Sequence, residues 1–228
     1  MSKAKRIDVG GMPYHVLNRA NGKKRIFRTD GDYRAFENVL IQASQKYPMR
    51  ILAYCIMPNH WHMVLWPHKD GDLAAFVGWL SLTHAQRWHA FHGTAGSGHV
   101  YQGPFKSFLI QSDGHLLTVC RYVERNPLRA HLVARAEAWR WSSLWWHAQG
   151  CSADLGILEG IWPVPRPPDW SSWVNQGDGN DAIGDVRDCV QRGKPFGAIG
   201  WVEDVVRRFN IVPALRPRGR PRNLSAAQ

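Results

Sequence analysis

The sequence predicts an α+β fold, and two observations lead to it. Residues 50–57 and 60–66 are apolar runs on either side of a Pro-Asn turn signal, as the two strands of a β-hairpin are. Apolar side chains recur at helical spacing before this hairpin, in residues 32–47, and again after it, from Asp72 onward. A hairpin between two amphipathic helices indicates that strands and helices pack together in one unit.

The first half of the chain gives the order strand, helix, strand, strand. Residues 14–18, Tyr-His-Val-Leu-Asn, have the composition of a short first strand. In the helix that follows, Phe36, Leu40 and Ala43 recur on one face. The hairpin then supplies the second and third strands.

The next segment completes a ferredoxin-like order. A second amphipathic helix begins near Asp72 and ends at the glycine-rich residues 93–98, and residues 105–111 form a fourth strand. The apolar positions of this helix are Leu73, Phe76, Val77 and Leu80. The order β-α-β-β-α-β is that of the ferredoxin-like fold, whose antiparallel sheet carries both helices on one face. We therefore expect the opposite face to be free for other elements.

A third helix, residues 112–125, follows the fourth strand and can pack across that free face. Asp113 is a suitable N-cap for it. Its apolar stripe consists of Leu116, Cys120 and Val123. Tyr122 lies off the stripe, and Asn126 follows about one helical turn later, so the two side chains can lie next to each other and contact the same group. Because Pro127 comes next, Asn126 can instead cap a new turn.

Two histidines stand at the start of the third strand. Since alternate residues of a strand point to opposite faces, Trp61, Met63 and Leu65 should cover the helices. His60 and His62 are then displayed together on the other face, close enough to share one metal ion. The alternative is that they are ordinary half-buried polar residues.

The charge and cysteine content limit the class of protein. Lys and Arg number 29 and Asp and Glu 18, a net charge of +11, so polyanions and above all nucleic acid are the expected partners. No apolar run approaches the roughly 18 residues that a membrane span needs, and the first residues lead into no signal-like core. The four cysteines form no CxxC pair, which argues against a zinc ribbon or a disulfide framework. A cytoplasmic protein with buried thiols is expected.

Two stretches combine these features, and they read MPNHWHMVLW and QGPFKSFLIQSDGHLLTVCRYVERNPLRAHLV. Together they resemble the REP-associated tyrosine transposases, a branch of the HUH single-tyrosine transposases. The resemblance covers residues 8–145 and extends more loosely to the end. It implies that His60 and His62 bind Mg²⁺ or Mn²⁺, that Tyr122 is the nucleophile, and that Asn126 is a third metal ligand.

The resemblance also implies a reaction and a substrate. The metal ion would polarise a scissile phosphate, and Tyr122 would attack it to give a covalent 5′-phosphotyrosine and a free 3′ hydroxyl. The implied substrate is single-stranded DNA beside a palindromic REP hairpin, in a bacterial, nucleoid-associated setting. Strands can then be cut and rejoined without ATP, and the sequence has no Walker motif. A monomer and a homodimer both remain open.

Several basic and aromatic residues are candidates for DNA contact. Lys106 and Arg121 flank the expected site and are predicted to contact phosphates. The tail contains R-G-R-P and resembles an AT-hook, in which Arg218 and Arg220 would enter a minor groove; a disordered basic tail is the alternative. A tryptophan cluster can serve as a stacking platform or as core. Its members are Trp139, Trp141, Trp145 and Trp146, interleaved with Arg135 and Arg140.

The predicted organisation has three parts. Residues 1–150 form the catalytic domain, residues 151–215 a small helical appendage, and residues 216–228 the basic tail. Proline- and glycine-rich loops mark the change of character after residue 150.

Two other functions remain open. One is a metal-dependent hydrolase that combines the H-x-H pair with other histidines and does not use Tyr122. The candidates for those further ligands are His84, His89 and His92. The other is a non-enzymatic module that keeps the fold and recognises hairpin DNA.

Overall fold

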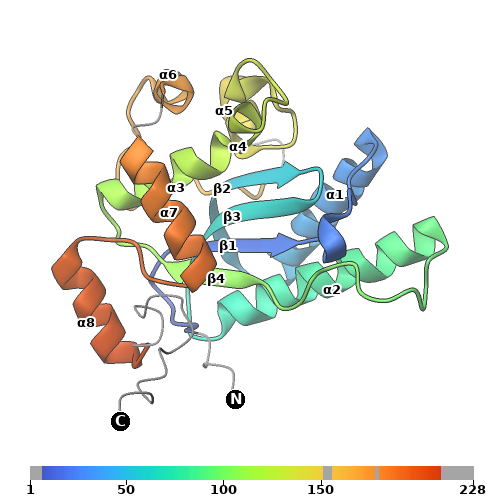
Figure 1. The fold of residues 1–228 in the computed structure, drawn as a ribbon, viewed down its shortest axis with the longest axis horizontal. Coiled ribbons are helices and arrows are strands. Elements are labelled where there is room, and N and C mark those ends of the chain that lie inside the picture. The colour runs from blue at the N-terminus through green and yellow to red at the C-terminus, as the bar shows by residue number, and fades with distance from the viewer. Residues whose placement is uncertain (1–6, 151–155, 178–179, 212–228) are drawn as a thin grey trace, which may run out of the picture.

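The computed structural model describes residues 7–150, 156–177 and 180–211 (Figure 1). Its first elements are β1 (Tyr14–Arg19), the 3₁₀ turn η1 (Asn21–Lys23), α1 (Asp30–Lys46), β2 (Met49–Met57), β3 (His60–Pro67), α2 (Asp72–His92) and β4 (Lys106–Leu109). They are followed by α3 (Gly114–Glu124), α4 (Asn126–Arg129), η2 (Ala136–Ala138), α5 (Ser143–Ala148), α6 (Trp170–Asn175), α7 (Asn180–Arg192) and α8 (Ile199–Phe209).

The four strands form one antiparallel sheet in the order β2-β3-β1-β4. This is the ferredoxin-like order, and it confirms the predicted α+β fold class. The first helix begins two residues earlier than its apolar pattern indicates. Thr29 accepts a hydrogen bond from the amide of Asp32, whose carboxylate accepts from the Thr29 amide, so a capping box fixes this start.

One face of the sheet is covered by α1 and α2. Trp61, Met63 and Leu65 point to this side and are fully buried. They pack with apolar residues of both helices. The apolar side chains that alternate along the strand thus face the apolar stripes of the two helices. The helix residues of this first core include Phe36, Val39, Leu40, Leu73, Phe76 and Leu80.

The opposite face carries α3, as predicted, and a second apolar core. Val64 of β3 and Phe108 of β4 lie in it beneath the buried stripe of α3. Helices α6 and α7 add Trp170, Val174, Val186 and Cys189 to the same core. The segment beyond residue 150 therefore contributes to the packing over this face. Where a domain boundary lies stays a prediction, and the tail at residues 216–228 is outside the described part of the chain.

Cys55, Cys120 and Cys189 are buried free thiols, and Cys151 lies outside the described residues. Within the described residues, no helix combines the length and the apolar character that crossing a bilayer requires.

Candidate active site

The sheet register places the two histidines of β3 on the face that α3 covers. His60 lies opposite Arg19 of β1, and His62 lies opposite Leu17. Opposed residues of an antiparallel pair point to the same face. The two imidazole rings meet edge to face with centroids 4.9 Å apart.

Hydrogen bonds orient both rings through the same nitrogen. Nδ1 of His60 lies 2.6 Å from Oδ1 of Asn59, and because that oxygen only accepts, Nδ1 carries the proton. Nδ1 of His62 lies 2.9 Å from Nε2 of His15, a buried residue of β1. Metal-binding histidines are commonly held in this way through their second nitrogen. Nε2 of each ring is thus the atom that a metal would take.

Burial keeps these imidazoles neutral. It lowers the pKa of His60 to about 3, with a smaller contribution from the positive charges of Arg19 and Arg129. Burial lowers the pKa of His15 to about 3 as well, and that of His62 well below its ordinary value. Neutral imidazole is the form that binds metal ions. The pair therefore fits a divalent cation that keeps open positions for other ligands.

Tyr122 of α3 faces the same cluster. Its ring centroid is 6.0 Å from that of His62 and 6.2 Å from that of His15, both in edge-to-face geometry. The guanidinium carbon of Arg129 lies 4.1 Å from the centre of the tyrosine ring. A phenol, two candidate metal ligands and a cation thus meet on one face of the sheet.

The rotation of α3 about its axis is fixed by a buried carboxyl group. Glu124, fully buried, accepts hydrogen bonds from Oγ of Ser143 at 2.5 Å and from Nε1 of Trp170 at 2.6 Å. Burial raises its pKa to about 7. These bonds tie α3 to α5 and α6, and so they hold Tyr122, two residues earlier, toward the histidines.

Asn126 caps the C-terminal end of α3. Its Nδ2 donates to the carbonyls of Tyr122 and Val123, at 3.1 and 3.2 Å. Its Oδ1 accepts from Arg129 at 2.7 Å. These contacts are those of a helix cap. The role of Asn126 as a third metal ligand stays a prediction.

Asn126→Ala is expected to lower the free energy of unfolding by about 1–2 kcal/mol, because a buried side chain that bonds two carbonyls at a helix end is lost. Urea denaturation would measure this. Mn²⁺ affinity, measured by calorimetry, should fall less than on loss of either histidine, because two imidazoles and water remain available to the ion. Unchanged stability together with strongly weakened Mn²⁺ binding would instead identify Asn126 as a ligand.

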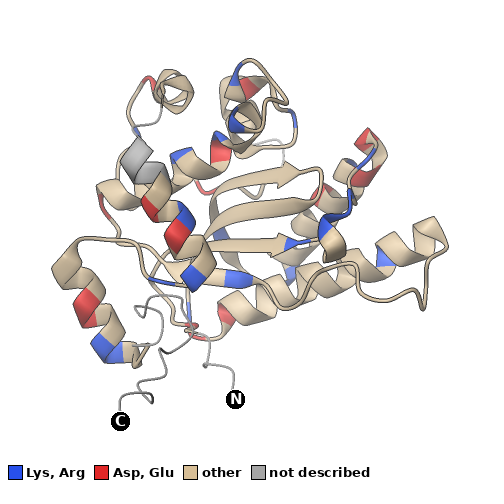
Figure 2. Ribbon diagram, viewed as in Figure 1, with Lys and Arg blue, Asp and Glu red and all other residues tan. Residues whose placement is uncertain are grey.

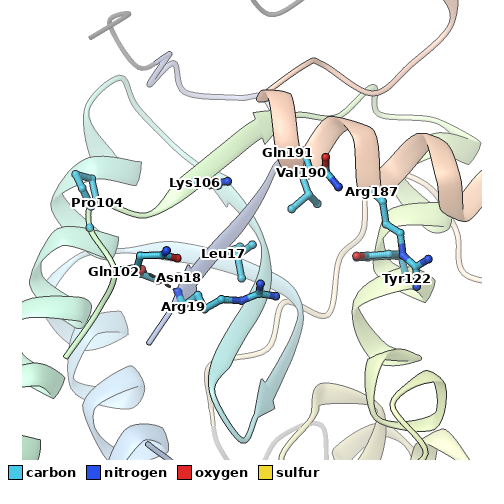
Figure 3. A pocket seen from close by; sticks show the side chains of 11 residues that line it. Leu17, Asn18, Arg19, Gln102, Pro104, Lys106, Tyr122, Arg187, Val190 and Gln191 are labelled. Carbon is cyan, nitrogen blue, oxygen red and sulfur yellow. Dashed lines mark hydrogen bonds between the residues drawn. The ribbon is translucent and has the colours of Figure 1, made fainter. Parts of the chain in front are cut away.

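A cavity of about 550 Å³ opens beside Tyr122 (Figure 3). Its walls come from β1, the segment before β4, β4 itself, α3 and α7. The lining residues are Leu17, Asn18, Arg19, Gln102, Gly103, Pro104, Lys106, Tyr122, Arg187, Val190 and Gln191. Three of them are cations and none is acidic, and Figure 2 shows basic residues on β1, β4 and α7. Lys106, predicted to contact phosphate, therefore shares a cavity with Tyr122.

Arg121, also predicted to contact phosphate, is not among the residues that line this cavity. Nε of Arg121 donates to the carbonyl of Trp173 at 2.9 Å, and its NH2 group donates to that of Gln176 at 2.7 Å. Arg121 therefore holds α6 against α3, and its contact with phosphate stays a prediction. Arg218 and Arg220 lie outside the described residues.

The tryptophan cluster packs largely into the first core. Trp141 and Trp146 are buried there, and Trp139 and Trp145 pack against it half-buried. Nε1 of Trp139 donates to the backbone of β2. Arg140 lies over the rings of Trp145 and Trp146, each at 4.4 Å.

The histidines of α2 are not near the H-x-H pair. His84 is buried on the helix side of the sheet, where its Nδ1 lies 2.8 Å from the hydroxyl of Tyr101. His92 pairs with Asp32, and His89 with Thr94. Over the described ranges, no three His, Cys, Asp or Glu side chains are grouped to hold a metal ion. A metal at His60 and His62 would thus need its other ligands from an amide, water or substrate.

Sequence reasoning missed His15, Arg19, Arg129 and Arg187 as site residues. His15 stands in a short strand whose pairing partner is far away in sequence, and the face it shares with His62 follows only from the β1–β3 register. Arg187 lies beyond the segment that carries the histidine and tyrosine motifs. The net charge of +11 is the sequence signal that indicates further cations near the site.

Three comparisons bear on this arrangement. The family model described as Transposase IS200 like matches residues 8–126, more than half of the chain. A protein of Haemophilus influenzae named as a REP-associated tyrosine transposase is 23% identical in an alignment of 116 residues that covers 47% of this chain. The match spans 66% of that relative, just under two thirds of its length. A solved structure of a REP-associated tyrosine transposase bound to a REP hairpin has a TM-score of 0.54 and 18% identity, covering 71% of this chain and 99% of that one. At this identity, the structural likeness shows a shared fold.

Proposed function

Because the chain belongs to the IS200-like transposase family, we propose that it cuts and rejoins single-stranded DNA beside palindromic, REP-type hairpins. The reaction is metal-dependent and passes through a covalent 5′-phosphotyrosine. The observation that carries the proposal is the convergence of Tyr122, His60 and His62 on one face, beside a cavity lined with cations. The names of the relative and of the solved structure, both REP-associated tyrosine transposases, support the hairpin substrate.

His60 and His62 would hold a Mg²⁺ or Mn²⁺ ion through Nε2. Such an ion, when bound, polarises the scissile phosphate and stabilises the charge that develops on it. Contacts of Nδ1 with Asn59 in His60 and with His15 in His62 already hold the two rings in the orientation that presents Nε2. The side chains therefore need little reorganisation when the ion binds.

Tyr122 supplies the nucleophile. Its Oη forms a bond to the scissile phosphorus, the bond from phosphorus to the 3′ oxygen breaks, and the DNA leaves with a free 3′ hydroxyl. The phenolic proton is released to solvent or to the departing oxygen. Arg129, stacked on the tyrosine ring, keeps the ring in place and adds positive charge beside the phosphate. Re-attack by a 3′ hydroxyl on the phosphotyrosine reverses these steps and joins strands.

The direct test uses end-labelled hairpin DNA with a single-stranded extension, incubated with the protein and Mn²⁺. We expect an adduct that survives denaturing electrophoresis and disappears with EDTA. Peptide mapping should place the DNA on Tyr122. Hairpin binding without any adduct, in Mn²⁺ and in a parallel reaction with Mg²⁺, would favour a non-enzymatic recognition module.

His15 acts on the site through His62. A His15→Phe variant keeps the ring that stacks on Phe108 but loses the nitrogen that bonds Nδ1 of His62. We expect Mn²⁺ affinity, measured by calorimetry without DNA, to fall about tenfold. His15→Gln, which can restore a hydrogen bond, should lose less. Equal Mn²⁺ affinity in the wild type and His15→Phe would show that His15 does not orient the ligand.

A further inference from the structure

Helix α7 forms one wall of the cavity beside Tyr122, although it lies beyond residue 126, where the family match ends. We propose that α7 completes the DNA-binding site and that Arg187 binds a phosphodiester of the single strand that reaches Tyr122. This inference rests on the proposed function and deepens it. It assigns part of the substrate site to the C-terminal segment.

Helix α7 is held firmly against the sheet. Val186 and Cys189 are buried in the second core. Just after the helix, the amide of Phe196 donates to the carbonyl of Leu109, and the amide of Gln111 donates to the carbonyl of Phe196, both at 2.9 Å. The chain therefore continues the sheet beyond β4, and α7 stays next to Lys106.

One side of α7 faces the cavity. Arg187, Val190 and Gln191 stand three and four residues apart, so they share that side. Figure 3 shows the side chain of Arg187 descending from α7 toward Tyr122. Arg187 is exposed, and it has no hydrogen bond or ion pair with any residue that the structure describes. Arg192 of the same helix differs, because it is paired with Asp188.

The chemistry of the cavity fits a nucleotide of a single strand. Arg187, Lys106 and Arg19 come from three different elements, and none of the described residues that line the cavity is acidic. Nε of Arg19 is buried with no hydrogen-bond partner in the described part of the chain. An unpaired cation of this kind suits a phosphodiester, which accepts forked hydrogen bonds from arginine. Leu17, Pro104 and Val190 offer apolar surface for sugar or base.

The test measures binding alone, with the full-length Tyr122→Phe variant as parent and EDTA present. The ligand is a labelled hairpin with a single-stranded extension, and affinity is followed between 50 and 300 mM NaCl. Adding Arg187→Ala should weaken binding about tenfold and reduce the slope of log affinity against log salt by about 0.7, the value for one phosphate contact to a single strand. Arg192→Ala, the matched control, should leave both close to the parent.

Two further arms make the result decisive. In the first, an uncharged methylphosphonate replaces one phosphate of the extension at a time. Binding to the parent should weaken when the phosphate that Arg187 contacts is replaced, whereas binding to the Arg187→Ala variant should not weaken further at that position. In the second, Arg187→Lys keeps the positive charge and should restore the salt slope. Such a restoration would show that the effect of Arg187→Ala is due to the lost charge and not to a folding defect. Equal affinity and slope in the Arg187 and Arg192 variants would overturn the role of α7 and leave the proposed function intact. A parent that binds no hairpin would overturn both.

Discussion

Replacing Tyr122 with phenylalanine is expected to abolish the covalent protein–DNA adduct, with at least about a thousandfold loss of cleavage. The change removes one oxygen from a half-buried ring. That ring keeps its edge contacts with His62 and its stacking with Arg129, so the fold and the hairpin affinity should stay the same. Denaturing electrophoresis of labelled DNA measures the adduct, and a filter-binding assay measures the affinity.

The matched control for this variant is Tyr47→Phe, at the C-terminal end of α1 on the other side of the sheet. It should form adducts at the rate of the wild type. Continued cutting by Tyr122→Phe would show that water attacks the phosphate. The chain would then act as a metal-dependent nuclease that does not use its tyrosine.

The arrangement of the histidines argues against the hydrolase that the sequence left open. That hydrolase needs ligands from α2 beside the H-x-H pair. His84 lies within the first core, and His89 and His92 bond to Thr94 and Asp32. The sheet separates all three from His60 and His62. Tyr122, by contrast, lies on the same face as the pair, with its ring centroid 6.0 Å from that of His62.

The local features of the fold could be predicted from the sequence because each depends on neighbours in the chain. The hairpin follows from two apolar runs around a Pro-Asn turn, and β2 and β3 pair there. The alternation in β3 places His60 and His62 on one face whatever the rest of the chain does. The off-stripe position of Tyr122 on α3 likewise follows from helical spacing.

The remaining features depend on contacts between distant segments. His15 meets His62 only because β1 lies beside β3, and one residue of slippage would turn His15 to the other face. The phosphate contact of Arg121 stays a prediction, and its bonds to carbonyls at the end of α6, more than 50 residues later, could not be predicted from the sequence. The place of α7 beside Tyr122 depends on the backbone bonds around Phe196. Sequence spacing carries no information about such pairings.

Alanine at His60 or at His62 is expected to remove metal-dependent cleavage and to weaken Mn²⁺ binding at least about a hundredfold, because each change takes away one of the two proposed imidazole ligands. The two variants should differ in stability. His62 is 3% exposed and bonded to His15, so His62→Ala leaves a buried imidazole unpaired and should cost about 1–3 kcal/mol of unfolding free energy. His60 is less buried and bonds an adjacent side chain, so His60→Ala should cost less.

Calorimetry with Mn²⁺, urea denaturation and adduct formation separate these effects. His68→Ala, at an exposed position just after β3, is the control and should match the wild type in all three. Adducts formed at the wild-type rate by both His60→Ala and His62→Ala would remove the metal from the mechanism. A loss of cleavage in His62→Ala alone, in step with its lost stability, would instead point to a structural role, since a shared ion requires both rings.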